Sequence, residues 1–197
     1  MTDPAASRQT PPVSAAVAHL PTPAPAPTGL DFRTIFETEF EYVWHSLRRL
    51  GVRERDVDDV THDAFIVVYR SLDQYDLGRP LRPWLFGIAT RLAANYRRRA
   101  YHRGDVMEPT TEVADQALGA DETLASRQAT ALVQAALDTL DDDRRSVFVL
   151  HELDGTSVPD IAAALSIPLN TAYSRLRLAR ADFSAAVRRL RAARGER

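Results

Sequence analysis

Residues 155–183, with the sequence GTSVPDIAAALSIPLNTAYSRLRLARADF, decide the fold of the C-terminal part of this chain. Ser157 and Asp160, three residues apart, form a capping box that begins a first helix. Pro168 ends that helix, because proline disfavours helical geometry in the residue before it. Asn170 is then the expected cap of a second helix, since its side chain can accept a hydrogen bond from an unpaired backbone N–H. The stretch therefore predicts two helices joined by a short turn.

The second of these helices has two chemically different faces. Four apolar side chains fall within a narrow arc at about 100° per residue, which predicts a buried face: Ala172, Leu176, Ala179 and Phe183. Polar side chains point the other way: Asn170, Tyr173, Ser174 and Arg177. Arg, Asn and Ser are side chains that contact base edges or phosphates in the major groove. The pattern favours a helix-turn-helix that binds DNA over a helical hairpin with a merely solvated polar face.

The composition limits the classes of function. The chain has 197 residues and no cysteine, which excludes disulfides and thiol chemistry and fits a reducing compartment. No apolar run approaches the roughly 18 residues of a membrane span. We also expect no secretory signal, because no basic region followed by an apolar stretch occurs at the N-terminus. All 25 basic residues are arginine. A soluble protein with a substantial helical core is expected.

Charge is strongly segregated along the chain, although the net charge is only −2. Residues 31–76 carry eleven acids against six arginines, whereas residues 79–103 carry seven arginines and no acid. Residues 104–126 carry six acids and no base, and residues 175–197 carry eight arginines against two acids. Alternating acidic and basic blocks predict separate surfaces for separate partners.

The basic block also contains aromatic residues. Between residues 75 and 103, Tyr75, Trp84, Phe86, Tyr96 and Tyr101 alternate with the seven arginines. Arginines that follow phosphates and aromatics that stack on bases are typical of single-stranded nucleic-acid sites. We expect Trp84 and Phe86 to lie in the core, so the arginines and Asn95 are the stronger candidates for DNA contact.

A predicted helix at 56–72 has acids and apolar residues on its outward side. Val57, Val60, Ala64, Val67 and Val68 form the expected buried stripe. Asp58, Asp59, His62, Ile66 and Tyr69 lie opposite, with Phe65 at the edge. Apolar residues among acids on an outward face favour a protein interface.

The whole pattern predicts an all-α chain of two small helical domains joined by an acidic flexible linker, the second domain being the helix-turn-helix. The expected divisions are a disordered Pro/Ala-rich tail at 1–28, a first domain at 29–105, a linker at 106–126, a second domain at 127–192 and a basic tail at 193–197. Helices are expected at 31–50, 56–72, 83–100, 123–139, 141–152, 158–166 and 171–192, with a loop at 73–82.

The two informative segments together closely resemble extracytoplasmic-function (ECF) sigma factors, the small promoter-recognition subunits of bacterial RNA polymerase. In the first domain the resemblance rests on Asp58-Asp59 through Phe65, Trp84-Leu85-Phe86, Ile88-Ala89 and Arg97-Arg98-Arg99. In the second it rests on Arg145, Val147-Phe148, Gly155, Ser157, Ile161-Ala162, Leu165, Thr171, Ser174-Arg175-Leu176 and Ala179-Arg180. It covers roughly 29–105 and 127–190, in the family's order.

The resemblance implies a cytoplasmic sigma factor that is not an enzyme and needs no metal or cofactor. It would bind core RNA polymerase, through the clamp helices of the largest subunit and the flap, together with promoter DNA and an anti-sigma factor, without membrane insertion. The core-binding residues would be Asp58, Asp59, His62, Asp63, Phe65 and Ile66. The −10 residues would be Arg79, Arg82, Arg91, Asn95, Arg97 and Arg98. The −35 residues would be Asn170, Thr171, Tyr173, Ser174, Arg175, Arg177 and Arg180.

Two other functions remain open at this point, and a third, an RNA-directed enzyme, is disfavoured because the sequence shows no catalytic constellation. A free-standing helix-turn-helix regulator would need a dimerisation surface and would give no role to the Arg/aromatic segment. A sigma mimic that titrates an anti-sigma factor would be expected to lack basic DNA faces, and both basic faces are present. His62 with Asp58 is a weak candidate for a metal or acid–base pair, because no third ligand follows at a suitable spacing.

Overall fold

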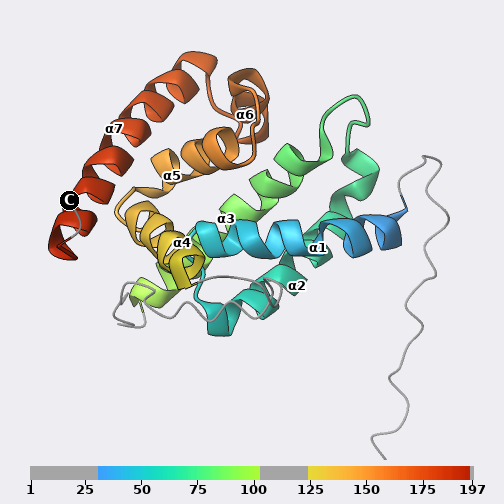
Figure 1. The fold of residues 1–197 in the computed structure, drawn as a ribbon. Helices are drawn as coiled ribbons and strands as arrows, with labels where there is room; N and C mark the ends of the chain where they lie inside the picture. The colour runs from blue at the N-terminus through green and yellow to red at the C-terminus, as the bar shows by residue number, and fades with distance from the viewer. Residues whose placement is uncertain (1–30, 103–123, 196–197) are drawn as a thin grey trace, which may run out of the picture.

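The computed structural model describes residues 31–102 and 124–195, and these residues form seven α-helices and no strand (Figure 1). The first three helices are α1 (Phe32–Arg49), α2 (Glu54–Ser71) and α3 (Leu81–His102), with a 3-10 turn, η1 (Leu72–Gln74), after α2. The others are α4 (Leu124–Leu137), α5 (Asp142–Phe148), α6 (Val158–Ala164) and α7 (Leu169–Ala193), with a π-helical turn, η2 (Val149–Leu153), after α5. The all-α prediction is confirmed, and the expected tail at 1–28 lies outside the described residues.

Helices α1, α2 and α3 pack against one another as the first unit. Gly51 ends α1 in the left-handed region, at φ +88°, a conformation that glycine adopts without steric cost. The interior of this unit is apolar and fully buried: Ile35, Val43, Leu47, Val57, Val68, Leu85 and Phe86. Phe86 is thus a core residue as predicted, while Trp84 packs at the edge of the core against the ring of Tyr75.

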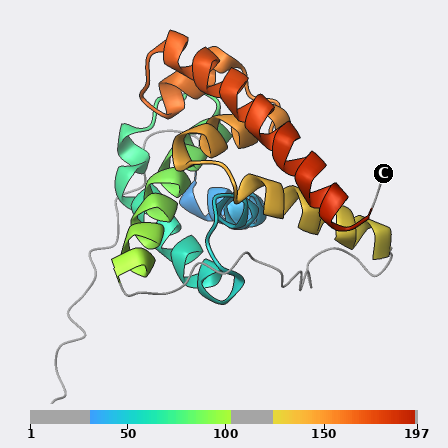
Figure 2. The same cartoon turned by 90° about the vertical axis from the view of Figure 1, so that its left-hand side faces the viewer.

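Helices α4 to α7 form the second unit, in which the long α7 lies across α4 and α5 (Figure 2). Asp141 caps α5 by accepting a hydrogen bond from the Arg144 amide at 2.8 Å. Ser157 caps α6 by accepting from the Asp160 amide at 3.3 Å, which confirms the predicted N-cap of this helix. Leu137, Val147, Leu150, Ile161, Ala172 and Leu176 make up its core.

Three details differ from the sequence prediction. Pro168, not Asn170, is the residue before α7, and no side chain caps this helix. Proline has the fixed φ that a capping position tolerates, so α7 begins at Leu169, two residues earlier than expected. Residues 124–126, assigned to the linker, are the first residues of α4, whereas 103–123 lie outside the described residues. The expected helix at 141–152 is divided into α5 and η2.

The buried stripe of α2 is rotated relative to the prediction. Phe65 is only 3 % exposed, and Val67 is 37 % exposed. Phe65 is turned inward because three phenylalanines of α1 surround it, with ring centroids 4.9 Å away for Phe36 and 5.9 Å for Phe40. Burying Phe65 among these rings stabilises the fold more than burying the smaller Val67 side chain would, because aromatic side chains bury more apolar area and interact favourably with one another.

The two units are packed together, which the prediction of two domains on a flexible linker did not foresee. One apolar cluster includes residues of both units, and α3 contacts α6 directly. A Cβ placed on Gly87 of α3 would lie 2.7 Å from the backbone oxygen of Ala164 in α6. Glycine is therefore what allows these two helices to approach so closely.

Candidate nucleic-acid and polymerase interfaces

Helix α7 presents the predicted DNA-reading face to solvent. Ala172, Leu176 and Ala179 are buried against α5 and α6. On the opposite side Tyr173 is 53 % exposed, and Ser174 and Arg177 are exposed as well. The 3.6-residue period of the helix is enough to predict which of these side chains are buried and which are exposed, and the structure has them on the predicted sides.

The arginines along this face have different partners. Arg175 forms an ion pair with Asp143 at 2.5 Å, and Arg180 forms one with Glu152 at 2.6 Å. Within the part of the chain that the structure describes, Arg177 has neither an ion pair nor a side-chain hydrogen bond. An exposed guanidinium without a partner keeps all its donors available for a ligand.

The N-terminal end of α7 carries the remaining −35 candidates. Asn170 is exposed in the first turn of the helix, and Thr171 is half-buried beside it. The Ser174 hydroxyl donates to the Thr171 carbonyl oxygen at 2.9 Å. These side chains lie at the N-terminal end of α7, next to the turn that follows α6. In a helix-turn-helix, the N-terminal end of the recognition helix is the end that contacts base edges.

The basic segment before and along α3 is largely exposed. Arg79 pairs with Asp76 at 3.4 Å, and Arg82 pairs with Glu39 at 2.9 Å while its guanidinium lies 4.9 Å from the centroid of the Tyr42 ring. Arg91 is exposed, and Arg98 is exposed and donates to the side-chain oxygen of Asn95. These five candidates are on the surface of the first unit.

Arg97 does not belong with that exposed group. Its side chain is 10 % exposed, its Nη2 lies 2.7 Å from a carboxylate oxygen of Asp142 in α5, and its Nη1 donates to the Leu50 carbonyl oxygen at 2.6 Å. Burial lowers the pKa of Arg97, and Asp142 opposes that shift. Unlike the other −10 candidates, Arg97 is therefore covered by the second unit in the conformation described, and its contact with −10 DNA stays a prediction.

The outward face of α2 carries five of the six core-binding candidates. Asp58, Asp59, His62, Asp63 and Ile66 are exposed. Asp58 accepts a hydrogen bond from the Trp44 indole at 2.8 Å, and His62 lies within 2.8 Å of the Asp58 carbonyl oxygen. Ile66 is 49 % exposed, and Tyr69 at 46 % extends the apolar surface beside it.

Phe65 is the sixth candidate, and it is buried in the aromatic cluster of α1 and α2. Because Phe65 lies at the edge of the predicted outward face, the sequence pattern does not say whether its side chain points to solvent or to the core. In the structure it points to the core, where it packs against α1. Phe65 therefore lies beneath the outward face in this structure, and its predicted role in core binding stays a prediction.

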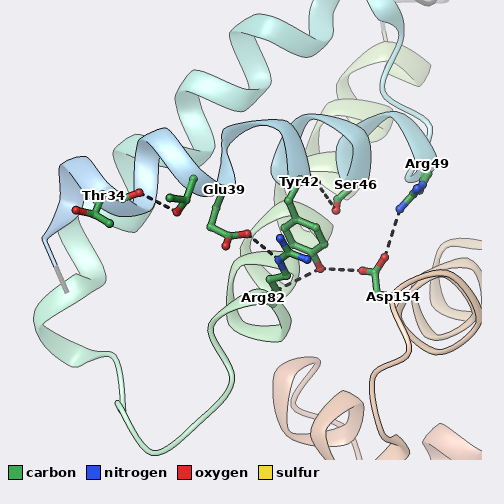
Figure 3. A network of polar contacts seen from close by, with 8 residues as sticks. Thr34, Glu39, Tyr42, Ser46, Arg49, Arg82 and Asp154 are labelled. Atoms are coloured by element: carbon green, nitrogen blue, oxygen red, sulfur yellow. Dashed lines mark hydrogen bonds and ion pairs between the residues drawn. The ribbon is translucent and has the colours of Figure 1, made fainter. Parts of the chain in front are cut away.

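Sequence reasoning missed a polar network between the two units (Figure 3). Asp154, in the turn before α6, accepts a hydrogen bond from the Tyr42 hydroxyl at 2.8 Å and pairs with Arg49 at 3.3 Å. Burial, and then the charge of Asp154, raises the pKa of Tyr42. Burial also raises the pKa of Asp154, while the Tyr42 hydrogen bond and Arg49 oppose that shift. No local pattern around residue 154 signals these contacts, because both partners lie more than a hundred residues away.

The described ranges hold neither a cluster suited to a metal ion nor a helix suited to a membrane. Within residues 31–102 and 124–195, no group of three or more His, Asp or Glu side chains could hold a metal ion. No helix in those same ranges is long and apolar enough to cross a membrane.

The chain matches two known protein families in the order of its two units. Residues 35–103 match the family described as Sigma-70 region 2, and residues 130–183 match Sigma-70, region 4. The RNA polymerase sigma factor CnrH of Cupriavidus metallidurans is 36 % identical over 147 residues, which is 70 % of this chain and 76 % of that protein. The ECF RNA polymerase sigma-E factor of Escherichia coli K12 is 33 % identical over 134 residues, 64 % of this chain and 70 % of that protein.

Two solved structures are similar to most of the chain. CnrH in complex with the cytosolic domain of CnrY superposes with a TM-score of 0.57 at 30 % identity, covering 78 % of this chain and 85 % of that one. The sigma factor RpoE of Bartonella quintana, in complex with the anti-sigma factor NepR, superposes with a TM-score of 0.62 at 21 % identity, covering 80 % and 97 %. The second likeness supports the fold alone.

These matches define a promoter-recognition subunit of bacterial RNA polymerase with regions 2 and 4. The chain belongs to the ECF family of RNA polymerase sigma factors. It binds core RNA polymerase and directs promoter-specific transcription initiation, with region 2 serving the −10 element and region 4 the −35 element.

Proposed function

We propose that the face of α7 opposite Ala172, Leu176 and Ala179 reads the −35 duplex in the major groove. Asn170, Tyr173, Ser174 and Arg177 would contact base edges, and Thr171, Arg175 and Arg180 would hold the helix on the phosphates. The observation that carries this proposal is Arg177, which is exposed at the centre of the face with no ion pair among the described residues.

The first unit would hold the melted −10 strand along the segment before α3 and along α3 itself. The groups for this role are the exposed Arg79, Arg82, Arg91 and Arg98 and the half-buried Asn95. A melted single strand needs a protein surface that neutralises its phosphates, and arginines supply the positive charge. Arg97 would take part only when the second unit does not cover it.

The outward face of α2 would bind the clamp helices of the largest polymerase subunit. Asp58, Asp59, His62, Asp63 and Ile66 combine negative charge with exposed apolar area. A buried apolar anchor ringed by charges is typical of a strong protein interface. Ile66 is the side chain best placed to be that anchor.

The sigma-factor role also implies a setting and a regulator. The protein would act in the cytoplasm, where core polymerase is found, and would contribute binding energy without catalysis of its own. CnrH forms a complex with the cytosolic domain of CnrY. By that likeness, an anti-sigma factor would hold this chain inactive until a signal releases it.

Run-off transcription with purified core polymerase on genomic fragments tests the proposal. We expect transcripts that depend on the added chain, with start sites that share one −35 and one −10 sequence. The Leu176→Ala variant is the control for folding of the second unit, because it removes a core side chain and should cost roughly 2–5 kcal/mol of stability. Absence of both transcript and core binding in the wild-type chain would overturn the proposal.

A further inference from the structure

Helix α7 exposes two large apolar side chains at its N-terminal end. Leu169 is 44 % exposed, Tyr173 is 53 % exposed, and neither belongs to the apolar cluster that the two units share. Among the described residues of the second unit, Leu153 is the one other large apolar side chain that is exposed. Two of these three side chains therefore lie one helical turn apart, on the segment that the proposed function places in the major groove.

The Tyr173 side chain has no polar or aromatic partner in the described part of the chain. Phe148 and Phe183, in contrast, stack in the second unit with their ring centroids 4.5 Å apart. Apolar area in water gains about 25 cal/mol for each Å² that a partner covers. The exposed pair Leu169 and Tyr173 is thus suited to a partner that presents apolar groups of its own.

The first turns of α7 present two parallel rows of side chains. Leu169, Tyr173 and Arg177 are four residues apart, so they follow one another along the helix, and this row is apolar at its start and basic at its end. Asn170 and Ser174 form the adjacent row, which is polar and exposed. The same end of the helix therefore combines an apolar row with a hydrogen-bonding row.

The base edges in the major groove determine which DNA suits these two rows. The one methyl group that an unmodified base presents there is the 5-methyl group of thymine, and apolar side chains contact it. Asparagine donates to and accepts from the edge of adenine in the same groove. An A·T pair therefore matches both rows, through the thymine methyl group on one side and the adenine edge on the other.

We propose that Leu169 and Tyr173 recognise 5-methyl groups of thymine in the −35 element, so that A·T pairs face the first turns of α7. Asn170 contacts the adenine edge of one of these pairs. Arg177 lies four residues beyond Tyr173, which is about 6 Å along the helix or roughly two base-pair steps, and contacts a guanine there. This inference rests on the proposed function of α7 and adds which bases the helix reads.

Replacement of thymine by deoxyuridine tests the proposal, because it removes one methyl group and keeps every hydrogen-bonding group of the base. The holoenzyme, assembled from core polymerase and the full-length chain, first selects its −35 sequence from a randomised promoter, and we expect A·T pairs in it. Each selected thymine is then replaced in turn. We expect about fourfold weaker promoter binding for each contacted thymine, the factor that corresponds to about 0.8 kcal/mol for one buried carbon group. Equal binding of the thymine and deoxyuridine templates at every position would overturn the proposal.

Variants assign the effect to the two side chains. Leu169→Ser combined with Tyr173→Ser should bind thymine and deoxyuridine templates equally, because the apolar row is gone. Tyr173→Phe keeps the ring and should keep the difference, which separates the ring from its hydroxyl. Leu153→Ser is the matched control, since it removes an exposed apolar side chain of the second unit that lies outside α7, and it should also keep the difference. A difference that survives in the double variant would overturn the proposal, because another group would then contact the methyl.

Thermal unfolding and a titration with core polymerase exclude indirect effects. Both replaced side chains are exposed, so we expect the double variant to keep its midpoint of unfolding and its affinity for core polymerase. Weaker core binding with an unchanged preference for thymine would mean that the apolar pair binds protein, and it would overturn this inference. A holoenzyme that selects no −35 sequence would remove the proposed −35 reading by α7 as well, whereas a selected −35 sequence that is insensitive to deoxyuridine would overturn the methyl contacts alone.

Discussion

Arg177 and Arg180 lie less than one helical turn apart on α7 but differ in their partners. Arg180 is paired with Glu152, whereas Arg177 is exposed with no ion pair in the described part of the chain. Arg177→Ala should therefore weaken −35 binding by about 1–3 kcal/mol and relax preference at one or two base pairs, because a bidentate base contact is lost. Binding-site selection followed by fluorescence anisotropy measures both effects.

Arg180→Ala is the contrasting variant. It should weaken binding evenly across sequences, as expected for a phosphate contact. If wild type and Arg177→Ala selected the same −35 sequence, Arg177 would only position the helix, and base reading would pass to Tyr173 or Asn170.

Neighbouring positions on α2 provide a second test at the scale of single residues. Phe65 is buried among aromatic rings and Ile66 is half-exposed. Phe65→Ala should lower the free energy of unfolding by about 3–5 kcal/mol, because it leaves a cavity in the core. Ile66→Ala should leave stability nearly unchanged and weaken core-polymerase binding by about 1–2 kcal/mol. Urea unfolding and a fluorescence titration with core polymerase separate the two effects.

The two outcomes are diagnostic together. Loss of polymerase affinity in Phe65→Ala at a temperature where it remains folded would mean that Phe65 reaches the partner after all. Wild-type affinity in Ile66→Ala would remove the apolar part of this face from the interface.

At the scale of elements, α6 supports the recognition helix α7, so the cap that begins α6 contributes to the stability of the whole helix-turn-helix. The Ser157 side chain accepts from the Asp160 amide and donates to its carboxylate at 2.6 Å. Ser157→Ala should lower stability by about 1 kcal/mol, the usual cost of losing such a cap. Thermal unfolding measures this loss. Ser184→Ala, at an exposed position of α7, should have no comparable cost, and equal shifts in both variants would show that the cap contributes nothing specific.

The sequence was enough to predict which segments are helical and which face of each helix is buried. It was not enough to predict where a helix begins or whether a side chain at the edge of a buried face is inside or outside. The 3.6-residue period placed Ala172, Leu176 and Ala179 inside and Arg177 outside, as the structure has them. It could not decide Phe65, because a side chain at the edge of a stripe is directed by its neighbours on another helix. The cap of α7 was misplaced for a similar reason: Asn170 and Pro168 both suit a helix start, and the tight turn after Ser166, at φ 54°, selected the earlier one.

At the scale of the whole molecule, the packing of one unit on the other was beyond sequence reasoning. Its contacts join Tyr42 to Asp154 and Arg97 to Asp142, and none of these pairs belongs to a local pattern. Arg97 shows the consequence: within a run of three arginines it had the same expected role as Arg98, yet only Arg97 is covered by the second unit. Charge segregation along the chain predicts charged surfaces, but it could not predict which of their members a second unit would cover.

That segregation leads to a prediction about salt. Each phosphate neutralised on a single strand contributes about −0.7 to the slope of log K against log salt concentration. Arg98→Ala should therefore reduce the slope for −10 single strands by about 0.7, since its exposed charge lies in the block that has seven arginines and no acid. Arg33→Ala removes an exposed arginine from the acidic block and should leave the slope unchanged. Anisotropy titrations of the full-length chain at several salt concentrations measure these slopes. Equal slopes in wild type and Arg98→Ala would mean that the basic block binds no phosphate at this position, and an equal reduction in Arg33→Ala would mean that only net charge matters.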